Sequence, residues 1–356
     1  MKKNIAFFGC LCFVLLQHGI ACTTFFINKN GQLVFGRNYD WVSDAGMVCT
    51  NLKGLNKTSV KTERSNTISW VSRYGSITFN QYGKEFPTGG MNENGLVVEL
   101  MWAEGTQYPK PDERPPLGVL QWIQYQLDNS ATIEDVIATN AKIRISPNNP
   151  PLHYLIADAH GNAATIEFFN GKIVVHTGKD LPFPVLTNSS YVESEKAAAE
   201  ANILSGNTSF SFRDNSLQRF TKACAMVQQY QQTEITKPVV DYAFDILKNV
   251  SQKDFTKWSI VYDLKNKKIY FKTARYPDIK SFPLNSFDFT CTSASKIMDM
   301  NQVLNGDINN NFKPFSKQIN RAIVEKAVEE SRSQVPISDK DKETSITYAG
   351  TIKCNE

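Results

Sequence analysis

The chain after residue 22 begins with apolar runs dominated by Thr, Phe, Ile and Val, and Asn-Gly chemistry interrupts them at Asn28 to Gly31. This pattern predicts two β-strands joined by a turn within residues 22–41. The runs ITFNQYG and GLVVELMW predict two more strands, with a turn between them over Gly89 to Gly95. The first part of the chain is therefore expected to form antiparallel hairpins.

The spacing of apolar residues then changes to a helical period. In PLGVLQWIQYQLDNS the apolar side chains recur every three or four positions, and ATIEDVIATNAKI repeats this spacing behind Thr132, a suitable N-cap. Strands return in residues 152–178, where DAHGN and NGK mark two tight turns. Three further helices are predicted over about residues 192–204, 215–232 and 238–251.

The last third of the chain combines a hairpin, a helix and a polar end. KWSIVYDLKNKKIYFKTA predicts a hairpin that turns at Asn266, and KPFSKQINRAIVEKAVEESRSQ predicts an amphipathic helix. From about residue 336 the composition predicts a polar, poorly ordered tail. Hairpins rather than βαβ units favour an α+β fold with sheets sandwiched by helices. Since no linker or repeat divides the chain, residues 22–356 are expected to form one domain.

The first 21 residues resemble a secretory leader. Lys2 and Lys3 precede an apolar run that is too short to span a bilayer, and small residues at Gly19 and Ala21 suit cleavage before Cys22. Residues 1–21 are therefore expected to be a signal peptide, and the mature protein to be periplasmic or secreted. No later run is long and apolar enough to predict a membrane span.

Composition and charge exclude several classes of function. The chain has 41% hydrophobic and 21% charged residues and a net charge of +4, without a block of like charge that would indicate a nucleic-acid partner. CxxC, HxxxH, Walker, GxGxxG and GxSxG motifs are absent. The spacing of His153, His160 and His176 does not match a zinc site. Neither a metal nor an organic cofactor is predicted.

Cysteine remains the best candidate nucleophile. Of seven cysteines, two leave with the leader, and the remaining five must include at least one unpaired thiol if the protein is exported. The sequence does not choose among possible disulfides of the cysteines beyond Cys22, namely Cys49, Cys224, Cys291 and Cys354. A Cys–His pair could use Cys22 or Cys224 with His153 or His160, although the pattern around Cys224 is typical of a buried helix face.

Cleavage before Cys22 would give one residue both a thiol and a free α-amine. A free α-amine ordinarily has a pKa of about 7.7–8.0 and a cysteine thiol one of about 8.5, so the amine can take the thiol proton and a histidine is not required. Arg37 and Asp40 in GRNYDW lie on the strand expected to return beside Cys22. Arg37 would lower the thiol pKa, and Asp40 would accept a hydrogen bond from the amine.

Several motifs, in order, resemble the choloylglycine hydrolase family: the Cys-Thr start after a leader, GRNYDW, GGMNENGL, VLTNSSY and NSLQRFTKA. The family includes bile salt hydrolases and penicillin V acylases, which are N-terminal-nucleophile hydrolases. The resemblance runs from Cys22 to about residue 274. It implies a four-layer αββα sandwich of antiparallel sheets, no cofactor, and hydrolysis of linear amide bonds in N-acyl compounds such as conjugated bile salts or penicillin V.

The resemblance also implies roles for individual residues. Cys22 would be nucleophile and base, with Arg37 beside the sulfur and Asp40 holding the amine. Asn188 in LTNSS would polarise the scissile carbonyl, and Arg219 in QRF would complete the polar cluster. Oligomers are common in the family, so a homo-oligomer is expected as one possible state.

One stretch departs from the family pattern. Many bile salt hydrolases carry an asparagine of the oxyanion hole after the GL of the second sheet segment, where this chain has Met101 or Trp102. These two residues are predicted to contact substrate, and Glu99 with Trp102 to shape a different pocket. The alternative for Trp102 is a place in the core.

Two other functions compete with amide hydrolysis. A cysteine directly after a leader is also where a lipid anchor is attached, although Gly19 replaces the leucine usual at the third position before that cysteine. Acylation would block the thiol and the amine. The other alternative is a protein of the same fold that binds acyl amides without cleaving them.

Overall fold

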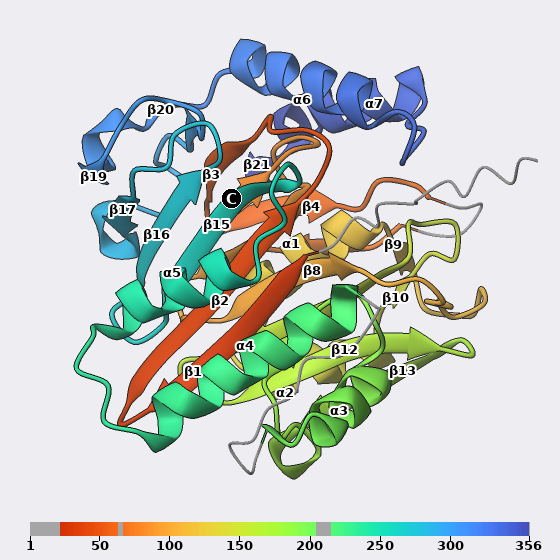
Figure 1. The fold of residues 1–356 in the computed structure, drawn as a ribbon. Helices are drawn as coiled ribbons and strands as arrows, with labels where there is room; N and C mark the ends of the chain where they lie inside the picture. The colour runs from red at the N-terminus through yellow and green to blue at the C-terminus, as the bar shows by residue number, and fades with distance from the viewer. Residues whose placement is uncertain (1–21, 63–66, 204–214, 356) are drawn as a thin grey trace, which may run out of the picture.

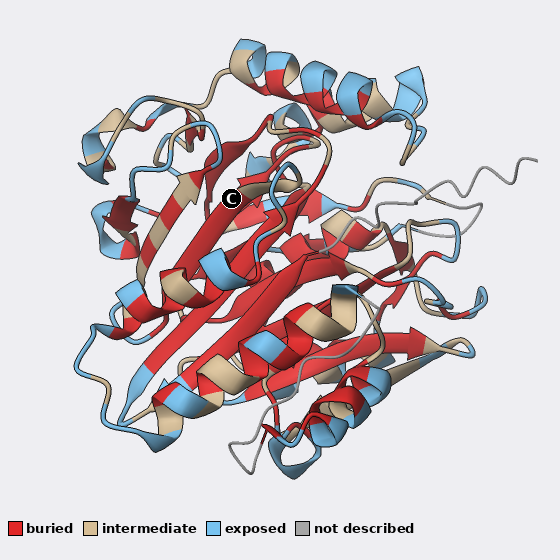
Figure 2. Cartoon of the chain, in the orientation of Figure 1, coloured by how far each residue is buried: buried red, intermediate tan, exposed pale blue. Residues whose placement is uncertain are grey.

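The computed structural model describes residues 22–62, 67–203 and 215–355. Two large sheets pack face to face, and helices cover both outer faces (Figure 1). The predicted α+β class and the four-layer αββα sandwich are confirmed. Buried residues fill the strands and the inner sides of the helices, while the exposed residues lie on the outer helical faces and loops (Figure 2).

The first sheet has seven strands, and the predicted N-terminal hairpin forms the second and third of them. Asn30 and Gly31 form the turn with φ of 51° and 74°, a left-handed conformation that asparagine and glycine tolerate. The strands, in their order across the sheet, are β14 (Val185–Leu186), β1 (Thr23–Lys29), β2 (Gln32–Asp40), β15 (Thr256–Asp263), β16 (Lys268–Thr273), β17 (Lys280–Pro283) and β19 (Gly306–Asp307).

The second sheet has nine strands, all paired antiparallel with their neighbours. Their order is β13 (Lys172–Thr177), β12 (Ala163–Phe169), β11 (Leu152–Ala157), β8 (Val97–Trp102), β7 (Pro87–Asn92), β6 (Ser76–Asn80), β3 (Met47–Asn51), β18 (Lys296–Asp299) and β20 (Lys313–Pro314). A large apolar core fills the space between the two sheets and continues under the helices of the first one.

Helices cover the outer faces because each presents an apolar stripe to a sheet. α4 (Asn215–Gln232) and α5 (Val239–Asn249) pack on β1, β2 and β15, and α1 (Val119–Asn129) packs on β7 and β8. The predicted Thr132 cap is present as a capping box at the start of α2 (Ile133–Ala138). Ser190 caps α3 (Tyr191–Glu200) in the same way, and part of the predicted 192–204 helix lies outside the described residues.

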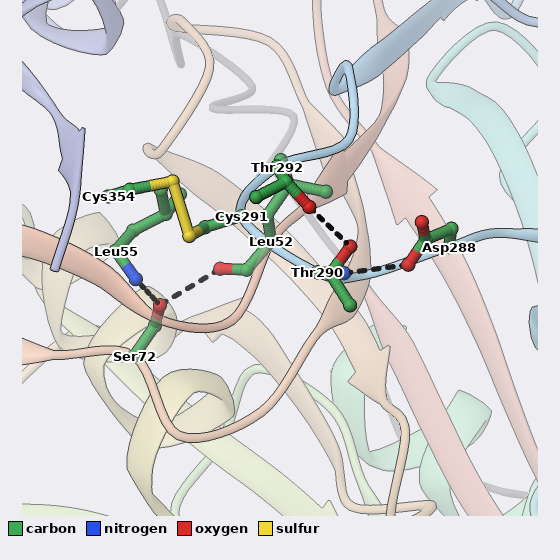
Figure 3. Close-up of a disulfide and its surroundings, with 8 residues drawn as sticks. All are labelled: Leu52, Leu55, Ser72, Asp288, Thr290, Cys291, Thr292 and Cys354. Carbon is green, nitrogen blue, oxygen red and sulfur yellow. Dashed lines mark hydrogen bonds between the residues drawn. A yellow bond between two sulfur atoms is a disulfide. The ribbon is translucent and has the colours of Figure 1, made fainter. Parts of the chain in front are cut away.

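The C-terminal segment contradicts the predicted poorly ordered tail. After α6 (Lys317–Ser331), the chain forms α7 (Asp339–Thr347) and β21 (Lys353–Cys354), which joins β4 (Leu55–Thr58) and β5 (Ser69–Val71) in a small sheet. A disulfide links Cys354 to Cys291 (Figure 3). Polar composition hid this order because α7 buries only Ile346 among its nine residues.

Two further observations complete the architecture. β9 (Pro116–Leu117) and β10 (Arg144–Ile145) form a short parallel pair beside the larger sheets. Among the described residues, every helix falls short of the length and apolar character needed to cross a membrane.

Candidate active site

Cys22 lies directly before β1, where the hairpin register determines its neighbours. Thr23 pairs with Asn38 and Thr24 with Arg37, so the end of β2 runs beside Cys22. The Cys22 sulfur lies 3.8 Å from the backbone oxygen of Asp40, and only 2% of the residue is exposed. The predicted return of GRNYDW beside Cys22 is therefore present in the structure.

Arg219 joins the cysteine to a helix far away in the sequence. From α4, its Nη1 donates to the backbone oxygen of Cys22 at 2.5 Å and to Thr23 Oγ1 at 2.6 Å, while Nη2 donates to Asn188 Oδ1 at 2.8 Å. One guanidinium thus holds the start of β1 and the loop after β14. Its planar array of donors suits this multiple contact better than a lysine ammonium would.

Asn188 is held through both its side-chain amide and its backbone. Its Nδ2 donates to the backbone oxygen of Trp102 at 2.7 Å, and its backbone N–H donates to Ser216 Oγ at 3.0 Å. Asn188 therefore bridges the end of β8, the loop after β14 and the start of α4. The structure brings Cys22, Asn188 and Arg219 close together, as the family resemblance implied.

Arg37 is completely buried and paired with Glu99, a contact that sequence reasoning missed. Its guanidinium also donates to the backbone oxygens of Thr88 at 3.1 Å and Leu100 at 3.2 Å. Tyr262 donates to the other oxygen of Glu99 at 2.5 Å. The signal was present in VVELMW, because a lone carboxylate in an apolar strand needs a buried cation or hydrogen-bond donors.

Gly89 leaves the space that this buried ion pair needs. A Cβ at this position would lie 1.9 Å from Glu99 Oε2, well inside van der Waals contact. Since β7 pairs Gly89 directly with Glu99, any side chain here would displace the carboxylate from Arg37. Glu99 therefore supports Arg37 and does not line the cavity, which corrects the expectation that it shapes the pocket.

Asp40 carries an unused hydrogen-bonding atom. Thr256 donates to its Oδ1 at 2.5 Å, whereas its Oδ2 is buried without a hydrogen-bond partner. A buried carboxylate oxygen normally accepts a hydrogen bond, so one without a partner marks a place where a donor is expected. In the full-length chain the nitrogen of Cys22 is a peptide nitrogen, because Ala21 precedes it.

Burial dominates the titration of this site. It raises the pKa of the Cys22 thiol to about 11, although Arg37 and Arg219 lower that pKa and Asp40 opposes them. Burial likewise raises the pKa of Asp40 to about 7, against the effect of Arg219 and the Thr256 hydrogen bond. With the leader attached, the thiol is therefore protonated at neutral pH.

The histidines do not join this cluster. The ring nitrogens of His153 contact Glu167 Oε1 at 3.1 Å and the backbone oxygen of Thr187 at 2.7 Å, so neither is left to serve a thiol. Cys224 is buried in the core, as its pattern predicted. Within the described ranges no hydrogen bond joins a cysteine to a histidine, and no group of three His, Cys, Asp or Glu residues could hold a metal ion.

A cavity of about 270 Å³ opens beside Cys22. Trp102 lines it, as predicted, and Leu100 lies on the same side of β8. Met101 does not line it: the alternation of the strand turns its side chain into the core, where its sulfur accepts a hydrogen bond from Thr24 at 3.3 Å. The prediction that Met101 contacts substrate is therefore wrong for this cavity. The remaining lining is mostly aromatic and aliphatic and comes from Tyr39, Trp41, Val60, Thr62, Tyr82, Phe86, Thr88, Gly118, Val119, Leu120, Gln121, Asn149, Pro150, Leu152 and five residues after position 334.

Known proteins resemble this chain in sequence. Residues 22–202 match the family described as linear amide C-N hydrolases, choloylglycine hydrolase family. A penicillin V acylase from Pectobacterium atrosepticum is 26% identical over 347 residues, which cover 83% of this chain and 90% of that protein.

Solved structures agree in fold. A penicillin V acylase from Agrobacterium tumefaciens superposes with a TM-score of 0.72 at 26% identity, covering 83% of this chain and 98% of its own. A conjugated bile acid hydrolase from Clostridium perfringens gives a TM-score of 0.65 at 19% identity over 80% of this chain and 99% of its own, a likeness of fold alone.

Proposed function

The chain belongs to the choloylglycine hydrolase family of linear amide C-N hydrolases, and from this premise we propose that it cleaves N-acyl amides with Cys22 as an N-terminal nucleophile. The observation that carries the proposal is the buried, unpartnered Oδ2 of Asp40, in the residue whose main chain contacts the Cys22 sulfur. Release of residues 1–21 would turn the nitrogen of Cys22 into an amine that can donate to this oxygen.

The proposed reaction begins with proton transfer inside Cys22. The α-amine accepts the thiol proton, and the thiolate attacks the amide carbonyl. The tetrahedral intermediate collapses to a thioester, the C–N bond breaks, and the amine product leaves with the proton. Water then attacks the thioester, which releases the carboxylic acid and restores the thiol.

The neighbouring side chains divide the supporting roles. Arg37 and Arg219 favour the thiolate electrostatically, because both lower the thiol pKa. Asp40 orients the amine. The Asn188 amide, which Arg219 and Trp102 hold in place, is proposed to donate to the substrate carbonyl. Its Nδ2 carries two N–H groups, so one can donate to the substrate oxygen while the other keeps its bond to the backbone oxygen of Trp102.

The proposed substrate has an apolar acyl group and a polar amine. The cavity suits the acyl group because aromatic and aliphatic side chains dominate its lining. Two relatives at 26% identity are penicillin V acylases, and these favour a phenoxyacetyl-type group over the steroid of a conjugated bile salt. Export after cleavage before Cys22, to the periplasm or the medium, belongs to the same proposal.

The test compares wild type, Cys22→Ala and Cys22→Ser on penicillin V, glycocholate, taurocholate and long-chain N-acyl amides. We expect wild type to hydrolyse at least one, Cys22→Ala none, and Cys22→Ser only slowly because a hydroxyl is harder to deprotonate. The intact mass of the mature protein should correspond to a chain that starts at Cys22. An added lipid mass, or undiminished turnover by folded Cys22→Ala, would overturn the proposal.

A further inference from the structure

The wall of the Cys22 cavity comes from both ends of the chain. Cys22, Tyr39 and Trp41 line it from the N-terminal hairpin region, whereas Val335, Ile337, Asp341, Thr344 and Ser345 line it from the segment around α7. We define these last five residues as the C-terminal wall. Val335 and Ile337 contribute its two apolar side chains, and both are only half-buried.

The C-terminal wall is held by contacts at both ends of α7. Asn320 of α6 donates from Nδ2 to the backbone oxygen of Ile346 at 3.0 Å, and Tyr348 donates to the backbone oxygen of Thr58 at 2.8 Å. Ser338 caps α7 by accepting a hydrogen bond from the N–H of Asp341 at 3.1 Å. These contacts fix the orientation of α7 and so hold its cavity-lining residues in position.

A disulfide completes the attachment. Cys354 in β21 forms a disulfide with Cys291 (Figure 3), and the same strand pairs with β4, where Cys354 lies opposite Leu55. Asn355 adds a hydrogen bond from its N–H to the backbone oxygen of Gly54 at 2.7 Å. Since the bond closes a 63-residue separation, it restricts the unfolded chain strongly and holds the end of the wall against the body of the domain.

A second chain of contacts connects the cavity to α6. Trp41 donates from Nε1 to Tyr82 at 2.8 Å, and Tyr82 donates to Ser331 Oγ at 2.9 Å. Trp41 and Tyr82 both line the cavity, and Ser331 is the last residue of α6. The segment that leads into Val335 therefore starts from a point fixed directly to the cavity.

We infer that the C-terminal wall limits the size of the acyl group, with Val335 and Ile337 as specificity-determining residues and the Cys291–Cys354 disulfide as their anchor. This inference rests on the proposed function, because the acyl group is assigned to this cavity. It names the substrate class more closely: a compact apolar acyl group, since a cavity of about 270 Å³ is near the lower limit for small-molecule sites.

Shortening Ile337 tests the inference. Ile337→Ala removes three carbons from the wall, so kcat/KM for a long acyl amide should rise relative to phenoxyacetyl by about 10-fold or more, a change of the size one methylene can produce in a pocket. Val303→Ala is the matched control, because Val303 is a 76% exposed aliphatic residue that does not line the cavity. Its ratio should equal that of wild type.

Removing the anchor gives an independent variant. Cys354→Ser should shift the same ratio in the same direction, by about 3-fold or more, and Cys291→Ser should match it because both break one bond. Alkylation of Cys22 by iodoacetamide should keep its wild-type rate in both, since the anchor does not touch the polar cluster. If a serine variant fails to fold, Ile337→Val and reduction of the wild-type disulfide provide the comparison.

Binding of carboxylic acid products to Cys22→Ala separates the two ideas. Calorimetry with phenoxyacetate, octanoate and dodecanoate should favour the compact acid, and adding Ile337→Ala should reverse that preference. If wild type hydrolyses no amide, the proposed function fails while this binding still tests the wall. An unchanged preference after Ile337→Ala, in turnover or in binding, would overturn the inference about the wall.

Discussion

The polar cluster and the C-terminal wall meet at one cavity but are built in opposite ways. In the cluster, the side chains of Cys22, Arg37 and Asp40 are almost fully buried, and their neighbours come from distant strands and helices. In the wall, residues are half-exposed, the helix buries one side chain, and a single disulfide anchors the end.

The difference separates chemistry from selectivity. In the proposed mechanism, Arg37 and Arg219 act on the sulfur through fixed charge, so a displacement of either should change the reaction for every substrate. Val335 and Ile337 offer only apolar surface, so a change there alters which acyl group fits. Changes in the cluster should therefore lower turnover on all amides, whereas changes in the wall should alter ratios between amides.

The largest effect is expected from one extra residue placed before Cys22. Such a chain has an amide in place of the proposed catalytic amine, so amide hydrolysis should fall about 10³-fold or more, within the range for loss of a general base. The chain that begins at Cys22 is the control. Mass spectrometry checks each N-terminus, and a fully active extended chain would contradict the role of the amine.

A pH effect on stability should follow from Asp40. Its pKa is about 7 in the folded full-length chain and 3.8 in the unfolded one. The protonated carboxyl therefore stabilises the folded state fully below pH 4, and this stabilisation is lost as pH rises through 7. Three pKa units correspond to about 4 kcal/mol at most. In the uncleaved protein, Asp40→Asn should therefore flatten the fall in melting temperature between pH 5 and 8.

Two comparisons sharpen this pH measurement. Burial also raises the pKa of Glu99 to about 7, so the Asp40→Asn profile should be shallower but not flat. The melting temperature of the mature protein should fall less steeply with pH than that of the uncleaved protein, because the α-ammonium group stabilises the Asp40 carboxylate. Parallel melting curves for all three proteins would contradict the assignment of the unpartnered oxygen.

Arg219→Lys should lower kcat/KM about 100-fold on every amide. A lysine can replace one of the contacts to Cys22, Thr23 and Asn188 but not all three, and mutation of one donor of this type costs about 10²–10³ in rate. Lys222→Ala, an exposed change on the same helix, is the control. Equal losses on compact and long acyl groups would place Arg219 with the chemistry, and a selective loss would contradict this.

The smallest effect should come from Ser338→Ala. Loss of the α7 cap costs about 1 kcal/mol of helix stability, which loosens the wall without touching the cluster. Turnover of phenoxyacetyl amides should stay within about 2-fold of wild type, and hydrogen exchange of α7 amides should accelerate. Ser316→Ala, which removes the cap of α6, should instead affect that helix.

Much of the fold was predictable because local chemistry agrees with it. Asn30 and Gly31 favour a hairpin turn, and Thr132 favours the start of a helix. Both features are present in the structure. Cys22, Arg37 and Asp40 were predictable as neighbours because they share that hairpin. Asn188 and Arg219 came only from the family resemblance, since contacts across 31 residues or more leave no local pattern.

The remainder depends on tertiary contacts. The partner of Arg37 is Glu99, which lies 62 positions further along the chain. The two residues meet only because the two sheets pack face to face. The order after residue 336 was missed because one buried isoleucine gives no apolar period. Ser338 followed by Asp341 is nevertheless a helix-start pattern, and the disulfide between Cys291 and Cys354 provides the anchor that the composition conceals.

The contact between Arg219 and the backbone of Cys22 spans 197 positions of sequence. Contacts of such separation form late, because a long loop must close before they stabilise anything. In an incompletely folded chain, Cys22 is thus an ordinary cysteine thiol without its guanidinium neighbour. Under the proposed mechanism, the sulfur would therefore be activated only once the domain is complete, and an unfinished molecule would carry no reactive thiolate that could modify its surroundings.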